Sequence, residues 1–400
     1  MKIKTSLILI TIVSVICDTM VLPFYPRFFL ERFAVDDPLH TGLYIATSCV
    51  TVMLMFPLWA RVAKRVNELH LWVYTQIASA VLGLSCFYTQ DLLLFWLLSQ
   101  IMLAFKASYL LIYPYVMRLE SQDKHLNMAS LFSVLMHFGA IGGALLGGAI
   151  MQWFAARYLY LIMMMGDLLQ VAVCVYLIRA YAIKSAGANE QSSSIGVPSI
   201  GSWPRYVWAL GLLSLIFYLA AFTIRPFLVL YWSRIAGVDD QIIAGFMYSI
   251  PGWVALLGLY VSYRHKGSLN GFQRIFLSLF ICILGCFMQA SEAPAWFIFG
   301  RIIFAWGLFQ ITVNLEVVLF ELSKPERFAA DYSRVHIFQN IGVIAASFIS
   351  ASLFSTLAAS WTFYTAAGAF CLTLILLVGF YRDKILSDLP RHWKFLGIRS

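Results

Sequence analysis

The sequence predicts an all-α integral membrane protein of twelve transmembrane helices, arranged as two six-helix bundles with both termini in the cytoplasm. Three observations predict this fold class: the composition, a series of twelve apolar segments, and an uneven placement of Lys and Arg. Of 400 residues, 61% are hydrophobic and 12% are charged, and the mean hydropathy is +0.82. A soluble domain carries about twice that share of charge, so lipid must be the main solvent of this chain.

Twelve apolar segments follow one another along the chain, and each is long enough to cross the hydrocarbon core as a helix. A helix also satisfies its own backbone hydrogen bonds, which lipid requires. The first six segments cover residues 6–30, 41–60, 70–89, 92–116, 128–154 and 158–181. The second six cover residues 206–232, 242–263, 272–290, 295–320, 333–356 and 361–381. The first segment lacks a signal-peptide cleavage site, so we expect it to be retained.

A polar stretch at residues 183–204 is rich in Ser and Gly and has no hydrophobic period, which is typical of a flexible linker. It divides the chain into an N-terminal bundle at 1–182 and a C-terminal bundle at 205–382, followed by a tail at 383–400. We expect the linker and the tail to be cytoplasmic.

A short internal repeat indicates that the two halves are related. The letters RFAVDD at 32–37 correspond to RIAGVDD at 234–240, and a Pro-Phe pair precedes each of them, at Pro23 and Pro226. Parallel repeats of this kind are known in transporters.

The orientation follows from the basic residues, which are enriched in cytoplasmic loops. With the N-terminus inside, the cytoplasmic segments carry 21 Lys and Arg residues and the outer loops carry four. This bias also accounts for the net charge of +9, so we expect no nucleic-acid partner. The loops lack an Asn-x-Ser/Thr site, which fits a multi-pass protein of the inner (plasma) membrane.

Six formal charges lie deep in the predicted helices, and each costs roughly 2.5–3.5 kcal/mol to insert. Such side chains must face a wet cavity or pair with one another. They are Asp18, Lys106, Asp167, Arg225, Arg301 and Glu316. All but Asp167 are on the first and fourth helices of the two halves. For Asp167, on the sixth helix, we favour a structural pairing. Buried ion pairs that only fix helix packing are the alternative for any one of the others.

The three basic members of this set suggest a binding site for an anionic or carboxylate-bearing solute, with a siderophore as one example. Lys106, Arg225 and Arg301 would form its positive lining. Polar residues on the same helices are further substrate-binding candidates, although such residues also hold helices together. These candidates are Tyr25, Gln100, Tyr113 and Asn314.

The acidic members are candidates for proton coupling, because burial disfavours an ionised carboxylate. Asp18 and Glu316 could therefore take up and release a proton during a transport cycle. His137 and His336 occupy similar places in the two halves and titrate near physiological pH, so they are secondary candidates. A histidine hydrogen-bonded within a helix interface is the alternative for both. We expect no cofactor other than the proton gradient, and no metal site.

The fifth helix carries glycines at four-residue spacing, Gly139, Gly143 and Gly147, followed by Gly148. Together with the twelve-helix, two-bundle architecture, this segment resembles the major facilitator superfamily, whose antiporter motif reads G-x-x-x-G-P-x-x-G-G. All four glycines match, and Ala144 stands at the proline position. The resemblance implies the proton-coupled antiporter and exporter branch, with helices 1, 4, 7 and 10 around a central cavity.

The loop after the second helix resembles the family's motif G-x-L-A-D-R-x-G-R-K less closely. Ala60 and Arg65 match, and Arg61 stands at the aspartate position. The resemblance implies a cytoplasmic gate at Arg61 and Arg65. In the fourth helix Gln100 matches the family's arginine-glutamine motif, with Leu97 at the arginine position.

Taken together, the sequence predicts a secondary transporter, a proton-coupled exporter of a small organic solute that works by alternating access as a monomer. Its partners are the solute, protons and the lipid bilayer. A multidrug or amphipathic-solute exporter and an importer of the same fold are the alternatives. A membrane enzyme or a non-transporting scaffold is a different class, and we expect no enzyme because the sequence has no catalytic cluster.

Overall fold

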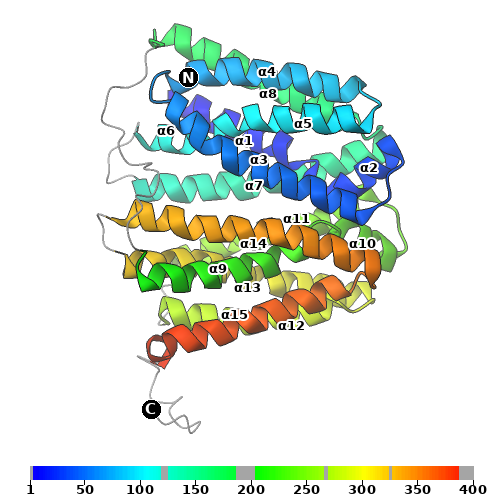
Figure 1. The fold of residues 1–400 in the computed structure, drawn as a ribbon, viewed down its shortest axis with the longest axis vertical. Coiled ribbons are helices and arrows are strands. Elements are labelled where there is room, and N and C mark those ends of the chain that lie inside the picture. The colour runs from blue at the N-terminus through cyan, green and yellow to red at the C-terminus, as the bar shows by residue number, and fades with distance from the viewer. Residues whose placement is uncertain (1–2, 119–124, 186–202, 265–268, 324–326, 387–400) are drawn as a thin grey trace. The chain divides into compact units, whose positions relative to one another are not determined.

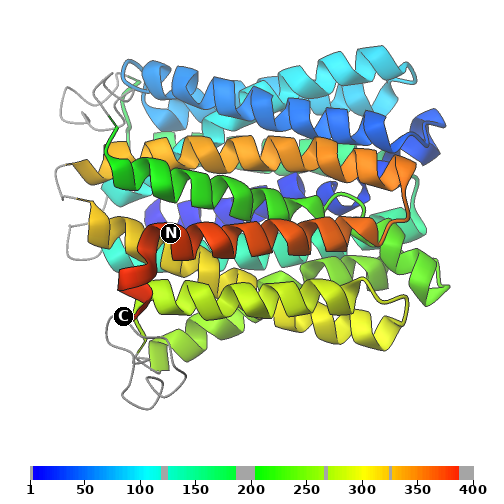
Figure 2. The same cartoon turned by 60° about the horizontal axis from the view of Figure 1, so that its bottom comes forward.

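A computed structural model of the chain describes residues 3–118, 125–185, 203–264, 269–323 and 327–386. Within these ranges every regular element is helical, as Figures 1 and 2 show. Most of the predicted linker (186–202) and most of the predicted tail (387–400) lie outside the described residues.

Twelve helical spans in the described ranges are long and apolar enough to cross a membrane, which confirms the predicted fold class. The first six are Thr5–Phe33, Pro38–Val62, Glu68–Tyr88, Leu92–Val116, Leu131–Trp153 and Tyr158–Ala180. The other six are Arg205–Ala236, Gln241–Ser262, Gly271–Gln289, Pro294–Leu322, Ala330–Thr356 and Trp361–Leu386. The orientation of the termini stays a prediction.

Three of these spans are built from more than one helix. The first consists of α1 (Ile3–Thr19), the short 3-10 turn η1 (Leu22–Phe24) and α2 (Tyr25–Phe33). The fourth consists of α5 (Leu92–Lys106), η2 (Ala107–Leu111) and α6 (Ile112–Arg118), and the seventh of α9 (Arg205–Thr223) and α10 (Leu228–Ala236). The remaining helices of the first half are α3 (Pro38–Val62), α4 (Glu68–Tyr88), α7 (His125–Trp153) and α8 (Tyr158–Ala180). Those of the second half are α11 (Gln241–Arg264), α12 (Gly271–Gln289), α13 (Pro294–Leu322), α14 (Phe328–Thr356) and α15 (Trp361–Leu386).

The repeated Pro-Phe pairs mark the breaks in the first and seventh spans. Proline has no backbone N–H and its ring clashes with the preceding turn, so a helix ends or bends there. The second piece of each span then ends on a left-handed residue at the same distance from its proline. These residues are Ala34, with φ 55°, and Gly237, with φ 63°.

The acidic residues of the repeat also have matching roles, because each begins the next helix. The Asp37 carboxylate accepts a hydrogen bond from the Leu39 N–H at 2.9 Å, at the start of α3. The Asp240 carboxylate accepts bonds from Ile242 and Ile243 N–H, both at 2.9 Å, at the start of α11. Such N-caps satisfy backbone donors that the first helical turn leaves unpaired. The internal repeat is therefore a repeat of structure.

Helix neighbours also repeat between the halves. In the first half α4 packs against α5 and α8, and α8 packs against α1. In the second half α12 packs against α13 and α15, and α15 packs against α9. Corresponding spans therefore have corresponding neighbours, as a duplicated six-helix unit requires.

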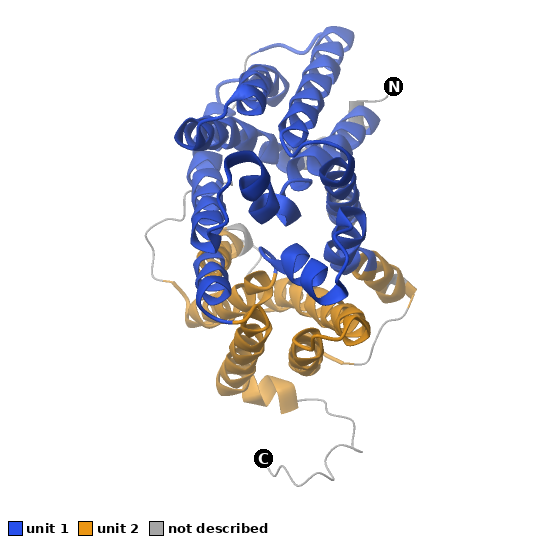
Figure 3. Cartoon of the chain, turned by 90° about the vertical axis from the view of Figure 1, so that its right-hand side faces the viewer, with its two compact units in different colours: residues 1–197, 225–253, 347–357 blue, residues 198–224, 254–346, 358–400 orange. Residues whose placement is uncertain are grey.

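By its contacts the chain divides into two compact units, which are coloured separately in Figure 3. Unit 1 comprises residues 1–197, 225–253 and 347–357. Unit 2 comprises residues 198–224, 254–346 and 358–400. The chain enters unit 1 again with α10, the first part of α11 and the end of α14. The predicted division into bundles at 182 and 205 stays a prediction.

Close packing at glycines explains why these later segments group with unit 1. A Cβ on Gly148 would lie 2.4 Å from the Gln241 carbonyl oxygen. A Cβ on Gly42 would lie 2.4 Å from the Ala351 Cβ. Helix backbones approach this closely only where one side chain is absent. The first turn of α11 therefore packs on α7, and the end of α14 packs on α3.

Large apolar side chains on the outside of the helices fit a lipid solvent. Leu93 is 79% exposed, Tyr74 and Trp153 are each 69% exposed, and Ile375 is 67% exposed. Acyl chains solvate such exposed apolar side chains well, whereas water does not.

Candidate transport sites

The first candidate site is an ion cluster within unit 1, formed by three of the charges predicted inside the helices. Lys106 Nζ donates hydrogen bonds to Asp18 Oδ1 at 2.7 Å and to Asp167 Oδ1 at 2.5 Å. Lys106 is the last residue of α5, where the helix tightens into η2, and the two acids are on α1 and α8. Three helices are thus held together at one cation.

Two serines complete the hydrogen bonding of the carboxylates. Ser79 Oγ donates to Asp167 Oδ2 at 2.7 Å, and Ser14 Oγ donates to Asp18 Oδ2 at 3.1 Å. The Asp167 side chain is only 1% exposed and that of Lys106 7%, but the Asp18 side chain is 36% exposed. Asp18 is therefore the most exposed member of the cluster.

The formal charges of this cluster do not cancel. Two carboxylates share one ammonium group, so the fully ionised cluster carries one negative charge in excess. The Tyr109 hydroxyl and the Cys17 thiol also lie close to Asp18, but neither brings a positive charge. A proton or a cation bound at Asp18 would neutralise the cluster. The structural pairing predicted for Asp167 is present.

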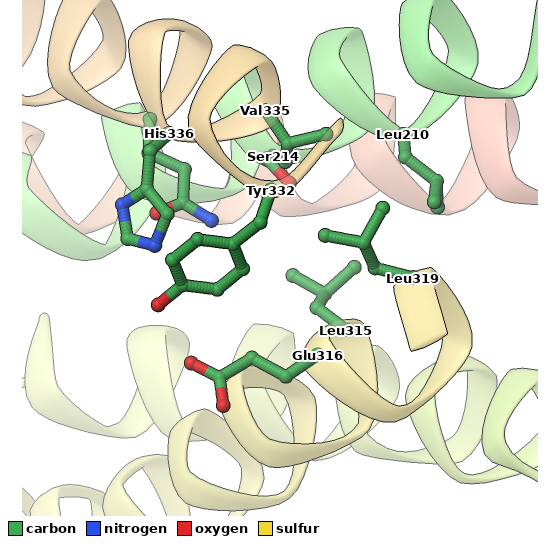
Figure 4. Close-up of a pocket in the computed structure, with 9 residues that line it drawn as sticks. Leu210, Ser214, Leu315, Glu316, Leu319, Tyr332, Val335 and His336 are labelled. Atoms are coloured by element: carbon green, nitrogen blue, oxygen red, sulfur yellow. The ribbon is translucent and has the colours of Figure 1, made fainter. Parts of the chain in front are cut away.

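The second candidate site is a pocket within unit 2, lined by α9, α13 and α14 (Figure 4). About 270 Å³ of space lies between and in front of the lining atoms, and this volume includes open solvent. The lining residues are Leu210, Ser214, Leu315, Glu316, Leu319, Tyr332, Val335, His336 and Gln339. The pocket thus combines one carboxyl group with aromatic, polar and aliphatic side chains.

Glu316 and His336, both predicted from the sequence, come together in this pocket. The Glu316 side chain is exposed and makes no hydrogen bond or ion pair with any residue that the structure describes. The His336 ring stacks on Tyr332, with 4.3 Å between ring centres. Its Nε2 is buried and has no hydrogen-bond partner in the described part of the chain. The exposed Glu316 carboxylate is thus accessible to a ligand, whereas His336 Nε2 is unpartnered but buried.

The predicted positive lining is not assembled in either unit. Arg301 is 2% exposed in unit 2, where its Nη1 donates to Gln289 Oε1 at 3.5 Å. Its guanidinium also lies 5.9 Å from the Phe304 ring centre. Arg225 is half-buried in unit 1, near His137. Lys106 is occupied by its two carboxylates, so a substrate-binding role for these three cations stays a prediction.

Two of the predicted polar candidates hold helices together in the structure. Gln100 on α5 accepts a bond from Thr51 Oγ1 at 2.8 Å and donates to Ser48 Oγ at 3.1 Å, which ties α5 to α3. Asn314 is buried and donates to the Gln310 carbonyl oxygen one turn earlier on α13, at 2.7 Å. Their binding of a solute stays a prediction.

The two predicted tyrosines differ in exposure. Tyr25 is buried and packs edge-on against Tyr44, with 5.0 Å between ring centres. Tyr113 is 41% exposed and contacts Phe132 at 5.2 Å. Tyr25 is therefore part of the aromatic packing of unit 1, and Tyr113 lies at its surface.

The glycines of the fifth span contact two different helices. A Cβ added to Gly139, Gly143 or Gly147 would meet atoms of the first span at 2.1–2.5 Å, whereas Gly148 faces α11. The motif therefore packs α7 between the first span and the eighth.

At the other end of the second span, the predicted gate residues Arg61 and Arg65 are both exposed. Neither makes an ion pair with a described residue. Their gating role stays a prediction.

Sequence reasoning missed a buried ion pair at the start of α14. Asp331 is 0% exposed and lies 3.5 Å from Arg334 Nη1. Its Oδ2 also accepts bonds from Tyr206 Oη at 2.5 Å and Ser323 Oγ at 2.8 Å. Neither charge is among the six that the sequence places deep in the predicted helices. Their spacing of three residues, which sets both on one helix face, was the available signal.

A second missed contact joins the two copies of the repeated segment. Arg27 on α2 pairs with Asp239, which precedes α11, and also donates to Glu31 at 2.6 Å. Gln152 at the end of α7 accepts a bond from the Gln241 N–H at 2.9 Å beside this pair. These groups lie at the end of unit 1 that the charge bias assigns to the outer side.

The family model of the Major Facilitator Superfamily matches residues 7–314, about three quarters of the chain. The chain belongs to the major facilitator superfamily. This confirms the resemblance seen in the sequence and makes the chain a multi-pass membrane transporter rather than an enzyme. A small-molecule substrate and a lipid bilayer are implied by that membership.

Individual relatives of this superfamily are distant. The chain is 20% identical, over 344 residues, to a protein named multi-drug resistance efflux pump PmrA homolog from Lactococcus lactis subsp. lactis (strain IL1403), with 84% of each chain covered. Among solved structures, a peptide transporter POT in complex with sulfate is 13% identical, with a TM-score of 0.73 over 96% of this chain and 94% of that one. The nucleoside transporter NupG is 12% identical, with a TM-score of 0.69 over 95% and 99%. These similarities establish the fold alone.

Proposed function

We propose that this major facilitator superfamily member is a proton-coupled exporter of a small organic solute, located in the inner (plasma) membrane. It works by alternating access and needs no cofactor other than the proton gradient. The observation that carries the proposal is the cluster of Asp18, Lys106 and Asp167, which has one more carboxylate than cations and one member open to water.

The cluster has the properties that a coupling site needs. Removing one partner of a buried ion pair costs about 3–5 kcal/mol, so the charge state of the cluster bears strongly on helix packing. Protonation of Asp18 removes one of the two partners of Lys106 and leaves the pair with Asp167 balanced. This loosens the contact of α1 with α5 while α5 stays joined to α8. A proton thereby changes which helices are held together.

The direction of transport is supported by two features. The relative from Lactococcus lactis is named as an efflux pump. The glycine motif of α7, which resembles that of the exporter branch, is fully used in close helix contacts. Export is the direction that both features favour, and an importer of the same fold is the alternative outcome of the test.

The predicted anionic solute, such as a siderophore, depended on free cations. Lys106 is held between two carboxylates and Arg301 is buried against Gln289. Of the three cations, Arg225 is the one that is half-buried. The anion hypothesis therefore has less support than the coupling hypothesis, and the test below includes solutes of every charge.

The proposal is tested in everted membrane vesicles that respiration makes acidic inside. A panel of cationic, neutral and anionic solutes is offered outside, and uptake into the vesicles corresponds to export from cells. We expect uptake of at least one solute, abolished by nigericin, which collapses the pH gradient. Asp18→Asn should abolish the nigericin-sensitive part, whereas Asp36→Asn, in the exposed outer loop, should retain it.

Two results would count against the proposal. Transport that continues unchanged in Asp18→Asn would place coupling elsewhere. Uptake only into right-side-out vesicles would make the chain an importer.

A further inference from the structure

We propose that the pocket within unit 2 binds the positively charged end of an amphipathic organic cation, with Glu316 as its counter-ion. This inference deepens the proposed transport function and rests on it, because it names the class of solute that the transporter carries. It differs from the anion that the sequence predicted.

The first argument for a cation is the charge of the pocket. Glu316 is exposed to the pocket and has no hydrogen-bond or ion-pair partner among the described residues, and none of the nine lining residues is Lys or Arg. An unpaired carboxylate within a membrane span is costly unless water or a counter-ion reaches it. An organic cation supplies that counter-ion, whereas an anion in the same space would meet like charge.

The second argument for a cation comes from the aromatic and polar groups of the pocket. Figure 4 shows the Tyr332 ring between His336 and the Glu316 carboxylate. A cation beside an aromatic ring is attracted to its negative face. The unpartnered Nε2 of His336 can accept a hydrogen bond from an ammonium group in the neutral tautomer that carries its proton on Nδ1. Both groups therefore favour a bound cation, as the Glu316 carboxylate does.

The remaining lining defines the rest of the ligand. Leu210, Leu315, Leu319 and Val335 give an aliphatic wall beside the polar groups. These side chains lie beside the carboxylate, so they would contact an apolar group next to the charged end of a solute. The solute class that matches both parts is an amphipathic cation.

Binding by purified full-length protein tests this inference with two probes of the same shape and opposite charge. Displacement of fluorescent ethidium is measured with tetraphenylphosphonium, a cation, and with tetraphenylborate, an anion. We expect the cation to compete and the anion to fail. Glu316→Gln should weaken tetraphenylphosphonium binding by about tenfold or more, as expected for loss of a charged partner. Glu321→Gln, on the same helix but outside the pocket lining, should bind like the unchanged protein.

Variants of Tyr332 separate binding from a structural effect. Tyr332→Phe keeps the ring and should retain most of the affinity for the cation, whereas Tyr332→Leu should weaken it several-fold. All variants are first compared by size-exclusion profile and thermal unfolding, so that a misfolded variant is recognised.

The outcomes distinguish this inference from the proposed function. Equal or stronger binding of tetraphenylborate, no binding of either probe, or an unchanged Kd in Glu316→Gln would overturn the cation site. Proton-dependent transport of an anionic or neutral solute in the vesicle panel would then leave the exporter proposal standing. If no solute is transported at all, the exporter proposal itself fails.

Discussion

The three charges of the unit 1 cluster show how position decides what one residue type can do. Asp18 and Asp167 both bond Lys106, but only Asp18 is exposed. Asp167 receives a second bond from Ser79 and is buried in the core. The exposed acid is suited to proton exchange, and the buried acid anchors the cation.

A substitution of Lys106 tests this division of roles. Lys106→Met leaves Asp167 buried without a cation, and we expect it to destabilise the protein by about 3–5 kcal/mol. The double variant Lys106→Met/Asp167→Asn removes the unpaired charge and should recover most of that loss. Thermal unfolding in detergent measures both. A Lys106→Met protein as stable as the original would show that the ion pair with Asp167 does not hold α5 to α8.

At this scale the sequence located the charges but not their partners. Asp18, Lys106 and Glu316 were recognisable because formal charge is costly in an apolar segment. The pairing of Lys106 could not be predicted, because it depends on three helices distant in the sequence. Arg301 illustrates the same limit, since its contact with Gln289 depends on how α12 packs against α13.

At the scale of secondary-structure elements, the sequence was most informative about the helices. The prolines and paired aspartates, at equal spacing in the two halves, predicted a structural repeat. In the structure the helix breaks, the left-handed residues at the helix ends and the aspartate N-caps occur in both halves. The twelve spans were recognisable from apolar length alone. The 3-10 turn after Lys106 was not predicted, although Pro114, whose ring clashes with the preceding turn, was an available signal. Helix α13, at the corresponding place in the second half, has no such break.

The two left-handed helix ends provide a matched pair of substitutions. Gly237 has open space around its α-carbon, so Gly237→Ala adds only backbone strain and should cost about 1 kcal/mol. Ala34 already carries that strain at an exposed position, so Ala34→Gly should raise stability, by less than about 1 kcal/mol, because glycine also gains entropy in the unfolded chain. Thermal midpoints should shift in opposite directions. Shifts in the same direction would show that the two ends are not equivalent.

At the scale of the whole molecule, the proposed cycle requires the outer contacts within unit 1 to open and close. These contacts are the pair of Arg27 with Asp239 and the glycine contacts of α7 with α11 and of α3 with α14. The sequence did not predict these contacts. They join segments of the two halves that are far apart in the sequence, and composition carries no information about such pairings.

Cross-linking tests whether these contacts must open. Arg27→Cys/Asp239→Cys is made in a background where the exposed Cys371 and the half-buried Cys49 are replaced by Ser. A short bifunctional thiol reagent should arrest transport, and a reductant that cleaves its linker should restore it. Each single-cysteine variant, treated in the same way, should continue to transport. Full activity of the cross-linked protein would mean that this end stays closed throughout the cycle.

The central claim is that the solute and a proton exchange through Asp18. Its most direct measurement is proton release from purified protein in weakly buffered detergent solution, followed with a pH-sensitive dye, when a solute from the vesicle panel is added. The account predicts release from the unchanged protein and from Asp36→Asn, and none from an Asp18→Asn protein that still binds the solute. Equal release from Asp18→Asn would contradict it.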